Sequence, residues 1–198
     1  MIADWVAEIP GFEITHFVEN LERERCEGTL GGLPIIWVDE VERFVESHRA
    51  VCALGSTHRS GLIEQVAGYG MPFATPVHPS AVVSSNSTLG EGTIVSPAVV
   101  VAGFTRVGRH VLLNRGALIG HDVELGDYVT IGPGANLAGF SRIGAATYVG
   151  MGAMVLDQVT VGAGSIIGAG AVVTRDVPDN VTVVGVPARV IKENVAGK

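Results

Sequence analysis

A six-residue repeat constrains the fold of this chain more than any other feature. Every sixth residue from Val83 to Val173 is aliphatic, and the residue two places before each of them is small or β-branched. A period of six fits neither a helix nor an ordinary alternating strand. It is the hexapeptide signature of a parallel β-helix. The aliphatic positions are Val83, Leu89, Val95, Val101, Val107, Leu113, Ile119, Leu125, Ile131, Leu137, Ile143, Val149, Val155, Val161, Ile167 and Val173.

The repeat has a direct geometric reading. Side chains alternate between the two faces of a strand, so each aliphatic residue and the small residue two before it point inward together. Three such faces close a coil of eighteen residues, and the register then predicts about five coils with a continuous core. Glycine often follows the aliphatic residue, as at Gly120, Gly126 and Gly144, where we expect a side chain to crowd the backbone.

The first 77 residues carry a different pattern, in which helix-like and strand-like runs alternate. This alternation predicts a small α/β unit with a parallel sheet. The expected helices cover residues 2–9, 39–47 and 57–70, with Asp39 as the N-cap of the second. The expected strands cover residues 12–18, 33–37 and 50–55.

The chain is therefore expected to have three parts. Residues 1–77 form the α/β unit, residues 78–177 the β-helix, and residues 178–198 a cap over its open end. A doubly wound nucleotide-binding domain begins with a strand and a glycine-rich phosphate loop, but residues 1–20 contain no G-x-G-x-x-G. The unit resembles a truncated Rossmann-like domain that has lost this loop, or a chain whose true start lies upstream, and both readings stay open.

Composition excludes several classes of protein. The mean hydropathy is +0.39, yet no run of eighteen apolar residues suggests a membrane span, and no signal peptide is recognisable, so we expect a cytoplasmic protein. The net charge of -7 lies within residues 1–78 and argues against nucleic-acid binding. Cys26 and Cys52 show neither disulfide nor metal-type spacing, and Cys52 is expected to be a buried small apolar residue.

His121 is the most distinctive candidate for chemistry. It comes two residues after Ile119, where the register places an outward-facing corner, and Asp122 follows it directly. A neutral imidazole with a neighbouring carboxylate is what a general base needs, because the carboxylate fixes the tautomer. Eighteen residues separate His121 from Gly139, so counting predicts that these two residues stack on one corner in consecutive coils.

The segment from Asn114 to Asp122, the hexapeptide register and the ending Gly185 to Arg189 resemble the left-handed β-helix acyltransferases. The resemblance extends to the branch that acetylates sugars, which comprises sialic acid O-acetyltransferases and the N-acetyltransferases that make bacillosamine and perosamine. Members of this branch carry a small Rossmann-like domain in front, and the resemblance covers essentially the whole chain. Hexapeptide repeats alone specify only the superfamily, whereas the Asn114 to Asp122 block narrows it.

The resemblance implies acetyl transfer from acetyl-CoA to an amine or hydroxyl of a sugar or nucleotide sugar, in polysaccharide biosynthesis and without a metal. It implies a homotrimer with each site between two subunits. Its implied residues are His121 as base, Asp122 as the group that polarises it, Gly139 as an oxyanion-type N–H donor to acetyl-CoA, Arg189 and Lys192 for the CoA phosphates, and Asn114, Gly55, Ser56 and Thr57 on the acceptor side.

Two departures from the family pattern concern the acceptor. Some members carry a second histidine nine residues after the base, where this chain has Thr130. The phosphate loop that would hold a nucleotide diphosphate is also missing. Acetyl transfer is therefore the expected reaction, with the acceptor left open.

Two other classes of function compete with this reading. The first is a γ-type carbonic anhydrase, which binds zinc through three histidines, but only His110 and His121 lie on the coils and their spacing of eleven does not suit. The second is a non-catalytic trimeric scaffold whose truncated front domain no longer binds an acceptor.

Overall fold

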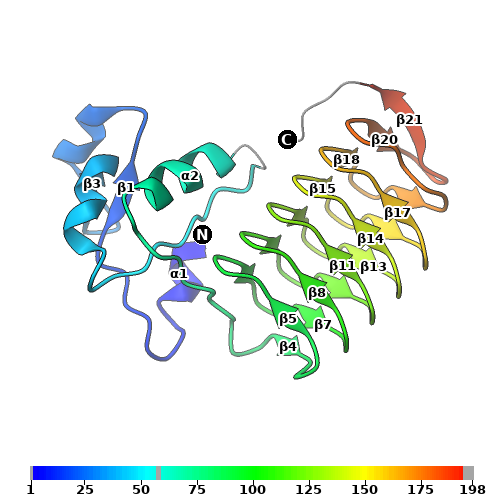
Figure 1. The fold of residues 1–198 in the computed structure, drawn as a ribbon, viewed down its shortest axis with the longest axis horizontal. Coiled ribbons are helices and arrows are strands. Elements are labelled where there is room, and N and C mark those ends of the chain that lie inside the picture. Colours follow the sequence, from blue (N-terminus) through cyan, green and yellow to red (C-terminus); the bar gives the residue numbers. More distant parts are fainter. Residues whose placement is uncertain (1, 57–58, 194–198) are drawn as a thin grey trace.

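Stacked coils dominate the computed structural model, which describes residues 2–56 and 59–193. A small domain lies beside the first coils and both ends of the solenoid are visible (Figure 1). The coils are built from very short strands, two residues each. These strands are β4 (Val82–Val83), β5 (Thr88–Leu89), β6 (Ile94–Val95), β7 (Val100–Val101), β8 (Arg106–Val107), β9 (Leu112–Leu113), β10 (Leu118–Ile119), β11 (Glu124–Leu125), β12 (Thr130–Ile131), β13 (Asn136–Leu137), β14 (Arg142–Ile143), β15 (Tyr148–Val149), β16 (Met154–Val155), β17 (Thr160–Val161), β18 (Ile166–Ile167) and β19 (Val172–Val173).

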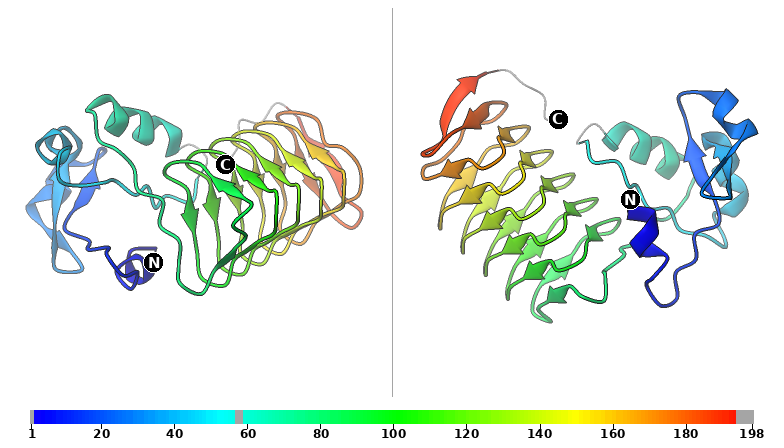
Figure 2. Two further views of the ribbon diagram at one scale, coloured as in Figure 1. Left: turned by 60° about the horizontal axis from the view of Figure 1, so that its bottom comes forward. Right: turned by 180° about the vertical axis from the view of Figure 1, so that it is seen from behind.

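Three parallel sheets run the length of the solenoid and form the sides of a prism (Figure 2). Each strand pairs with the strand one coil away, so that Ile119 lies opposite Val101 on one side and Leu137 on the other. The spacing is eighteen residues in every pair between β4 and β19. The predicted coil is confirmed, and its register does not slip.

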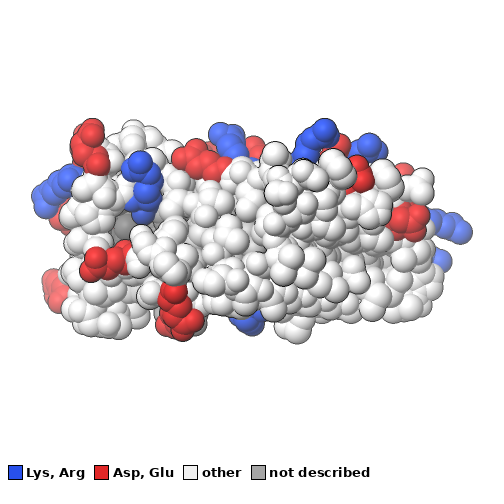
Figure 3. Space-filling view, turned by 90° about the horizontal axis from the view of Figure 1, so that it is seen from below, with Lys and Arg blue, Asp and Glu red and all other residues white. Residues whose placement is uncertain are grey.

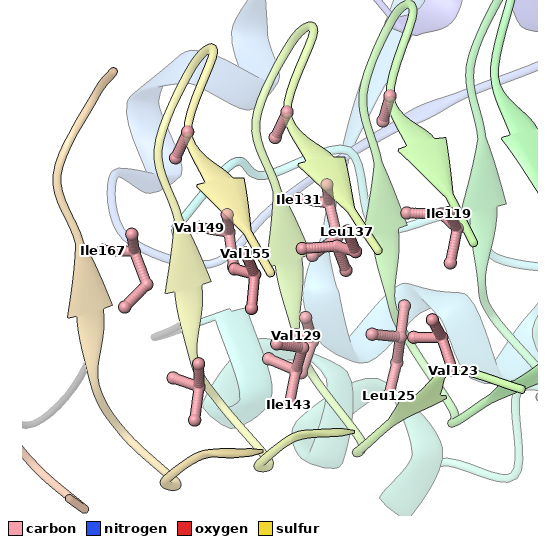
Figure 4. Close-up of a cluster of buried hydrophobic side chains, with 14 of the residues drawn as sticks. Ile119, Val123, Leu125, Val129, Ile131, Leu137, Ile143, Val149, Val155 and Ile167 are labelled. Carbon is pink, nitrogen blue, oxygen red and sulfur yellow. The ribbon is translucent and has the colours of Figure 1, made fainter. Parts of the chain in front are cut away.

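The core of the prism consists of the aliphatic side chains that the register marks. Ile119, Leu137 and Val155 occupy equivalent positions in consecutive coils and point into the interior (Figure 4). Each is almost completely buried, which contributes about 1.5–3 kcal/mol per side chain. The small inward residues close the corners, as where Thr105 Oγ1 donates to the carbonyl of Gly120 at 2.7 Å.

Backbone crowding explains the glycines that follow the aliphatic residues. A Cβ placed on Gly126 would lie 2.6 Å from the amide nitrogen of Ala145, and one on Gly120 would lie 2.8 Å from that of Gly139. Real Cβ atoms do not approach backbone so closely, and the stacked coils cannot move apart without breaking their hydrogen bonds. Glycine at these positions is therefore a packing requirement, as the sequence predicted.

The outer faces of the three sheets differ in character. On the sheet containing β6, β9 and β12, the outward residues Ile94 and Leu112 are buried, next to the small domain. The sheet of β5, β8, β11, β14 and β17 carries a charged row in which Arg106 and Arg142 both pair with Glu124. The third sheet, with β4, β7, β10, β13, β16 and β19, presents exposed apolar side chains. Seen from below, the solenoid is a broad surface with few charges (Figure 3).

The small domain contains a three-stranded sheet in the order β1-β3-β2. β1 and β3 are parallel, whereas β2 and β3 form an antiparallel pair. Val38, Val41, Val66 and Met71 form its buried core. Its elements are α1 (Ile2–Val6), β1 (Phe17–Glu19), the 3-10 helix η1 (Arg23–Glu27), β2 (Thr29–Leu30), β3 (Leu33–Trp37), the 3-10 helix η2 (Val38–Phe44) and α2 (Ser60–Gly68).

Several expectations for this domain are corrected. Residues 50–55 do not form a strand: within the described ranges, Ala50 alone of them exchanges backbone hydrogen bonds with a neighbouring segment, at Pro72 and Ala74. Only the end of residues 12–18 pairs, within β1, and the sheet is mixed rather than parallel. Asp39 is not an N-cap: the helix begins at Val38 because the Glu40 carboxylate accepts the N–H of Trp37 at 3.2 Å. Cys52 is only half-buried, although burial still raises the pKa of its thiol.

The C-terminal segment closes the far end of the solenoid. β20 (Thr182–Val184) continues the sheet of β18, and β21 (Arg189–Lys192) turns back antiparallel to it. The sheet edge at this end is thereby covered by a hairpin. In the described part of the chain, no helix is long and apolar enough to span a membrane.

Candidate active site

The turn after β10 brings His121 and Asp122 into contact. His121 Nδ1 lies 2.9 Å from Asp122 Oδ2. Asp122 has a left-handed backbone (φ 55°), a conformation that aspartate adopts more readily than most residues. An Nδ1–H that donates to this carboxylate leaves the lone pair of Nε2 free to accept a proton. The imidazole is 59% exposed, so the free nitrogen is accessible to a substrate.

Gly139 lies directly beside this imidazole, one coil later. A Cβ on Gly139 would lie 2.8 Å from His121 Nε2, so any side chain there would displace the ring. Among the described residues, the Gly139 N–H donates to no acceptor. Phe140, the next residue, packs against the imidazole edge-to-face with ring centres 5.1 Å apart. The stacking of His121 and Gly139 on one corner is the arrangement that counting predicted.

Asn114 lies on the preceding corner, away from His121 in the same chain. It is half-buried, and its Nδ2 donates to the carbonyl of Ile131 at 3.1 Å. Within one chain the structure therefore does not bring Asn114 to the His121–Asp122 pair.

Arg189 and Lys192 are exposed on β21, at the far end of the solenoid. Arg189 Nη1 donates to the carbonyl of Ala188 at 2.8 Å. β10 and β19 are three coils apart in one sheet, and β21 lies at the same end of the solenoid as β19, beyond β20. At the usual strand spacing, the two basic residues therefore lie about 15–20 Å along the axis from His121.

Gly55 and Ser56 precede α2 in the small domain, and Thr57 lies outside the described residues. The Ser56 carbonyl accepts from Arg59 Nη1 at 2.9 Å. Arg59 itself binds the corner between β11 and β12, whereas His121 lies on the corner between β10 and β11. The proposed acceptor loop is thus next to a different corner from the His121 of its own chain.

Sequence reasoning missed two residues at these corners, Arg59 and Phe140. Arg59 is 3% exposed and donates to the solenoid from the small domain. Phe140 contacts His121. Counting along the register could have placed Phe140 beside Asp122, but the sequence held no signal that Arg59 reaches the solenoid.

His110 belongs to the interface between the domains. It is 8% exposed, stacks on Tyr128 with ring centres 5.4 Å apart, and meets Phe73 edge-to-face. Burial lowers its pKa, and Arg109 adds to the effect. Its spacing of eleven from His121 places it on another corner. Within the described ranges, no three His, Cys, Asp or Glu side chains could hold a metal ion together.

Two hollows occur away from His121. A cavity of about 750 Å³ lies in the small domain between residues 11–18 and 47–54. A shallow groove of about 580 Å³ follows Gly108, Gly126 and Gly144 near the next corner of the solenoid. Neither is lined by His121, whose surroundings in a single chain are open.

Comparison with known proteins gives a consistent result. The family model "Bacterial transferase hexapeptide (six repeats)" matches residues 104–139 and 140–175. No curated protein sequence matches the chain.

Several solved structures are similar over nearly the whole chain. The acetyltransferase domain of PglB from Neisseria gonorrhoeae, in complex with acetyl coenzyme A, has 32% identity and a TM-score of 0.85, covering 96% of this chain and 94% of that one. WeeI from Acinetobacter baumannii has 27% identity and a TM-score of 0.85, covering 96% and 93%. PerB from Caulobacter crescentus, in complex with CoA and GDP-perosamine, has 29% identity and a TM-score of 0.80, covering 89% and 96%.

The three-sided prism of hexapeptide coils with a histidine–aspartate pair at a corner defines an acyltransferase class. The chain belongs to the left-handed β-helix, hexapeptide-repeat acyltransferases, in the branch of the sugar N-acetyltransferases. The fold class and the family that the sequence predicted are confirmed.

Proposed function

We propose that this acyltransferase moves an acetyl group from acetyl-CoA to an amino or hydroxyl group of a sugar or nucleotide sugar. The observation that carries the proposal is the His121–Asp122 pair beside the open N–H of Gly139. The bound acetyl coenzyme A in the PglB domain and the CoA and GDP-perosamine in PerB support the choice of substrates.

The geometry supports direct transfer with His121 as general base. Nε2 takes the proton from the acceptor nitrogen or oxygen while that atom bonds to the thioester carbonyl carbon. The Gly139 N–H donates to the oxygen that becomes negative, as an oxyanion-type donor. When the carbon–sulfur bond breaks, the proton on Nε2 passes to the CoA sulfur. Asp122 holds the imidazole in the required tautomer throughout.

We place acetyl-CoA along the axis of the solenoid. Its thioester lies at Gly139, and its phosphates reach toward Arg189 and Lys192, three coils further on. Charge-assisted hydrogen bonds to phosphate are the expected role of these two exposed cations.

We infer that the active form is a homotrimer whose subunits associate through the apolar sheet face. Val82 is 63% exposed on this face, Leu118 43% and Met154 51%. The face borders the corner that carries His121, so a neighbouring subunit there would wall the site. Asn114, which does not reach His121 in its own chain, is then available to the site of a neighbour.

Residues 1–77 are proposed to bind the acceptor, with Gly55, Ser56 and Thr57 facing it. This domain lies along the β6–β9–β12 sheet, and the corner of His121 lies opposite that sheet in the prism. We therefore expect the acceptor held by one subunit to react at the His121 of the next.

Replacement of His121 tests the mechanism. We expect His121→Ala to lower the rate of CoA release about 10²–10⁴-fold, because general-base catalysis contributes about this much. Asp122→Asn should have a smaller effect, since the base remains. The assay measures CoA release from acetyl-CoA against a panel of amino and hydroxy nucleotide sugars, including GDP-perosamine.

Both variants should remain trimeric with unchanged thermal unfolding, because these side chains are exposed. Full activity of trimeric His121→Ala would eliminate the base role. A wild-type trimer that binds no acetyl-CoA and transfers to no acceptor would instead favour the scaffold reading.

A further inference from the structure

The Arg59 guanidinium joins the small domain to the solenoid. Its Nη1 donates to Ser56 O at 2.9 Å within the small domain and to Thr130 Oγ1 at 2.7 Å on the solenoid. Its Nη2 donates to three solenoid carbonyls, those of His110 at 2.7 Å, Val129 at 3.1 Å and Tyr128 at 3.2 Å. One buried side chain thus connects Ser56 and the start of α2 to two adjacent coils.

The solenoid supplies these acceptors through its repeat. His110 and Tyr128 are equivalent corner residues one coil apart, both with left-handed backbones (φ 55° and 62°). In the described part of the chain, their carbonyls accept no other hydrogen bond. The planar fork of arginine can reach acceptors on two coils at once, which the single ammonium of lysine cannot do as well.

This contact is energetically unusual because Arg59 pairs with no carboxylate in residues 2–56 and 59–193. No carboxylate among the described residues accepts a hydrogen bond from it, and burial lowers its pKa. Removing a cation from water without a counter-ion is costly, and backbone carbonyls and a hydroxyl offset only part of that cost. An apolar contact would join the domains at a lower desolvation cost. The advantage of arginine here is that its hydrogen bonds require acceptors at particular positions.

The Arg59 contact determines at which coil along the solenoid axis the small domain is attached. Tyr128, Val129 and Thr130 belong to the same coil as His121, one corner further along the chain. A shift of the contact by one coil would move the acceptor loop about 4.8 Å along the axis. In a cyclic trimer with parallel axes, equivalent coils lie level with each other, so the loop of one subunit is level with the His121 of the next.

We propose that Arg59 is a positioning residue that holds Ser56, on the proposed acceptor side of the small domain, at the level of the coil that carries His121, an inference that rests on the function proposed above. Thr130 has a matching role: it is 1% exposed and bonded to Arg59, so its hydroxyl serves the domain contact. The linker makes further contacts, from Phe73 to Glu91 and His110 and from Thr75 to Gly90, and all of these partners belong to earlier coils than that of His121.

Kinetics with separate variation of the two substrates tests the proposal. We expect Arg59→Gln to lower kcat/KM for GDP-perosamine, the acceptor probe, about 10²-fold, because small misplacements of a reactant cost about this much. The KM for acetyl-CoA should stay within about twofold, since its proposed site lies on the solenoid. The acceptor kcat/KM of Arg59→Lys should lie between those of Arg59→Gln and wild type. A purely electrostatic role would not require this loss, since lysine keeps the positive charge.

Thr130 gives the complementary pair of variants. Thr130→Val removes the hydroxyl at nearly constant volume and should reproduce part of the acceptor defect, whereas Thr130→Ser keeps the hydroxyl and should restore it. The matched control is Arg43→Gln, which removes an exposed arginine of the small domain whose side chain pairs with Glu40 on the same helix. This control should leave both kinetic constants unchanged.

Hydrogen exchange gives a readout that needs no acceptor. Amides of α2 should exchange faster in Arg59→Gln, while those of β13 to β18 keep their wild-type rates. If wild type transfers to no acceptor, the proposed function fails and hydrogen exchange still decides the Arg59 role. Unchanged exchange in α2 together with an unchanged acceptor kcat/KM would overturn the inference. If Arg59→Gln unfolds the small domain, Thr130→Val decides by the same two measurements.

Discussion

At the scale of single residues, the corner that carries His121 has a carboxylate and an aromatic ring beside the imidazole, both on residues with a left-handed backbone. Asp122 and Phe140 are equivalent positions in consecutive coils, and both have left-handed backbones. Each such residue costs about 1–2 kcal/mol relative to an ordinary conformation. At Phe140 the aromatic ring is retained in spite of this cost, and it packs on the imidazole.

Phe140→Gly should therefore separate activity from stability. Glycine relieves the left-handed strain, which offsets the lost contact, so the free energy of unfolding should stay within about 1 kcal/mol of wild type. The turnover number should fall about three- to tenfold, because an aromatic contact of about 0.5–1.5 kcal/mol no longer orients the imidazole. Steady-state CoA release and thermal unfolding measure the two effects.

Phe104→Gly is the matched control for this prediction. Phe104 is also exposed, has a φ of 62°, and occupies the same corner one coil before Asp122. Among the described residues, it makes no ring contact with His121. Equal losses of activity in the two variants would show that Phe140 does not orient the base.

The sequence predicted the site only as far as the repeat reaches. His121, Asp122 and Gly139 could be placed together because a constant period of eighteen converts sequence spacing into spatial neighbourhood. Arg59 could not, since its partners on the solenoid are 51 to 71 residues away and are mainly backbone carbonyls, which carry no signature in the sequence. Asn114 matched a family motif, but it does not reach His121 within one chain, so its proposed role depends on a second chain.

At the scale of elements, the two-residue strands depend on the close approach of coils at glycine. The same spacing that leaves no room at Gly126 leaves Gly139 facing a side chain. In the small domain, the sequence pattern was a weaker guide to which residues form strands. Residues 50–55 have strand-like composition, but a strand forms only where a neighbour supplies backbone partners, and composition does not report on the neighbour.

Alanine at Gly126 should affect stability, whereas alanine at Gly139 should affect activity. Gly126→Ala places a Cβ 2.6 Å from backbone and should lower the free energy of unfolding by about 1–3 kcal/mol. In Gly139→Ala the atoms nearest to the new Cβ belong to the exposed side chain of His121 rather than to backbone, so its unfolding should match wild type while the rate of CoA release falls about 10²-fold through displacement of the imidazole. Thermal unfolding and CoA release distinguish them, and a large loss of stability in Gly139→Ala would contradict the geometry.

At the scale of the whole molecule, the three faces of the prism differ in what they contact. One face lies against the small domain, one carries paired charges, and the apolar face has exposed Leu118 and Met154 without a covering element. In the proposed trimer, this third face is the one that meets another copy.

Leu118→Glu should therefore convert the trimer to monomers and abolish transfer. A carboxylate buried at the subunit contact would cost several kcal/mol, whereas the monomer keeps its fold because Leu118 points outward. Light scattering after size exclusion measures the mass. The control Thr88→Glu adds a carboxylate next to Arg106 on the charged face and should stay trimeric; a trimeric, active Leu118→Glu would assign the contact to another face.

The uninterrupted register limits which changes of length the solenoid can accept. An insertion of six residues between His121 and Gly139 would carry every later residue to the next side of the prism, and Gly139 would leave the base. Only insertions or deletions of eighteen residues preserve the corner. Such a change placed after Gly139 would keep the chemistry and alter the separation of Arg189 from the base by about 4.8 Å. If the register is kept, the distance between Gly139 and Arg189, along which acetyl-CoA is proposed to lie, can therefore change only in whole coils.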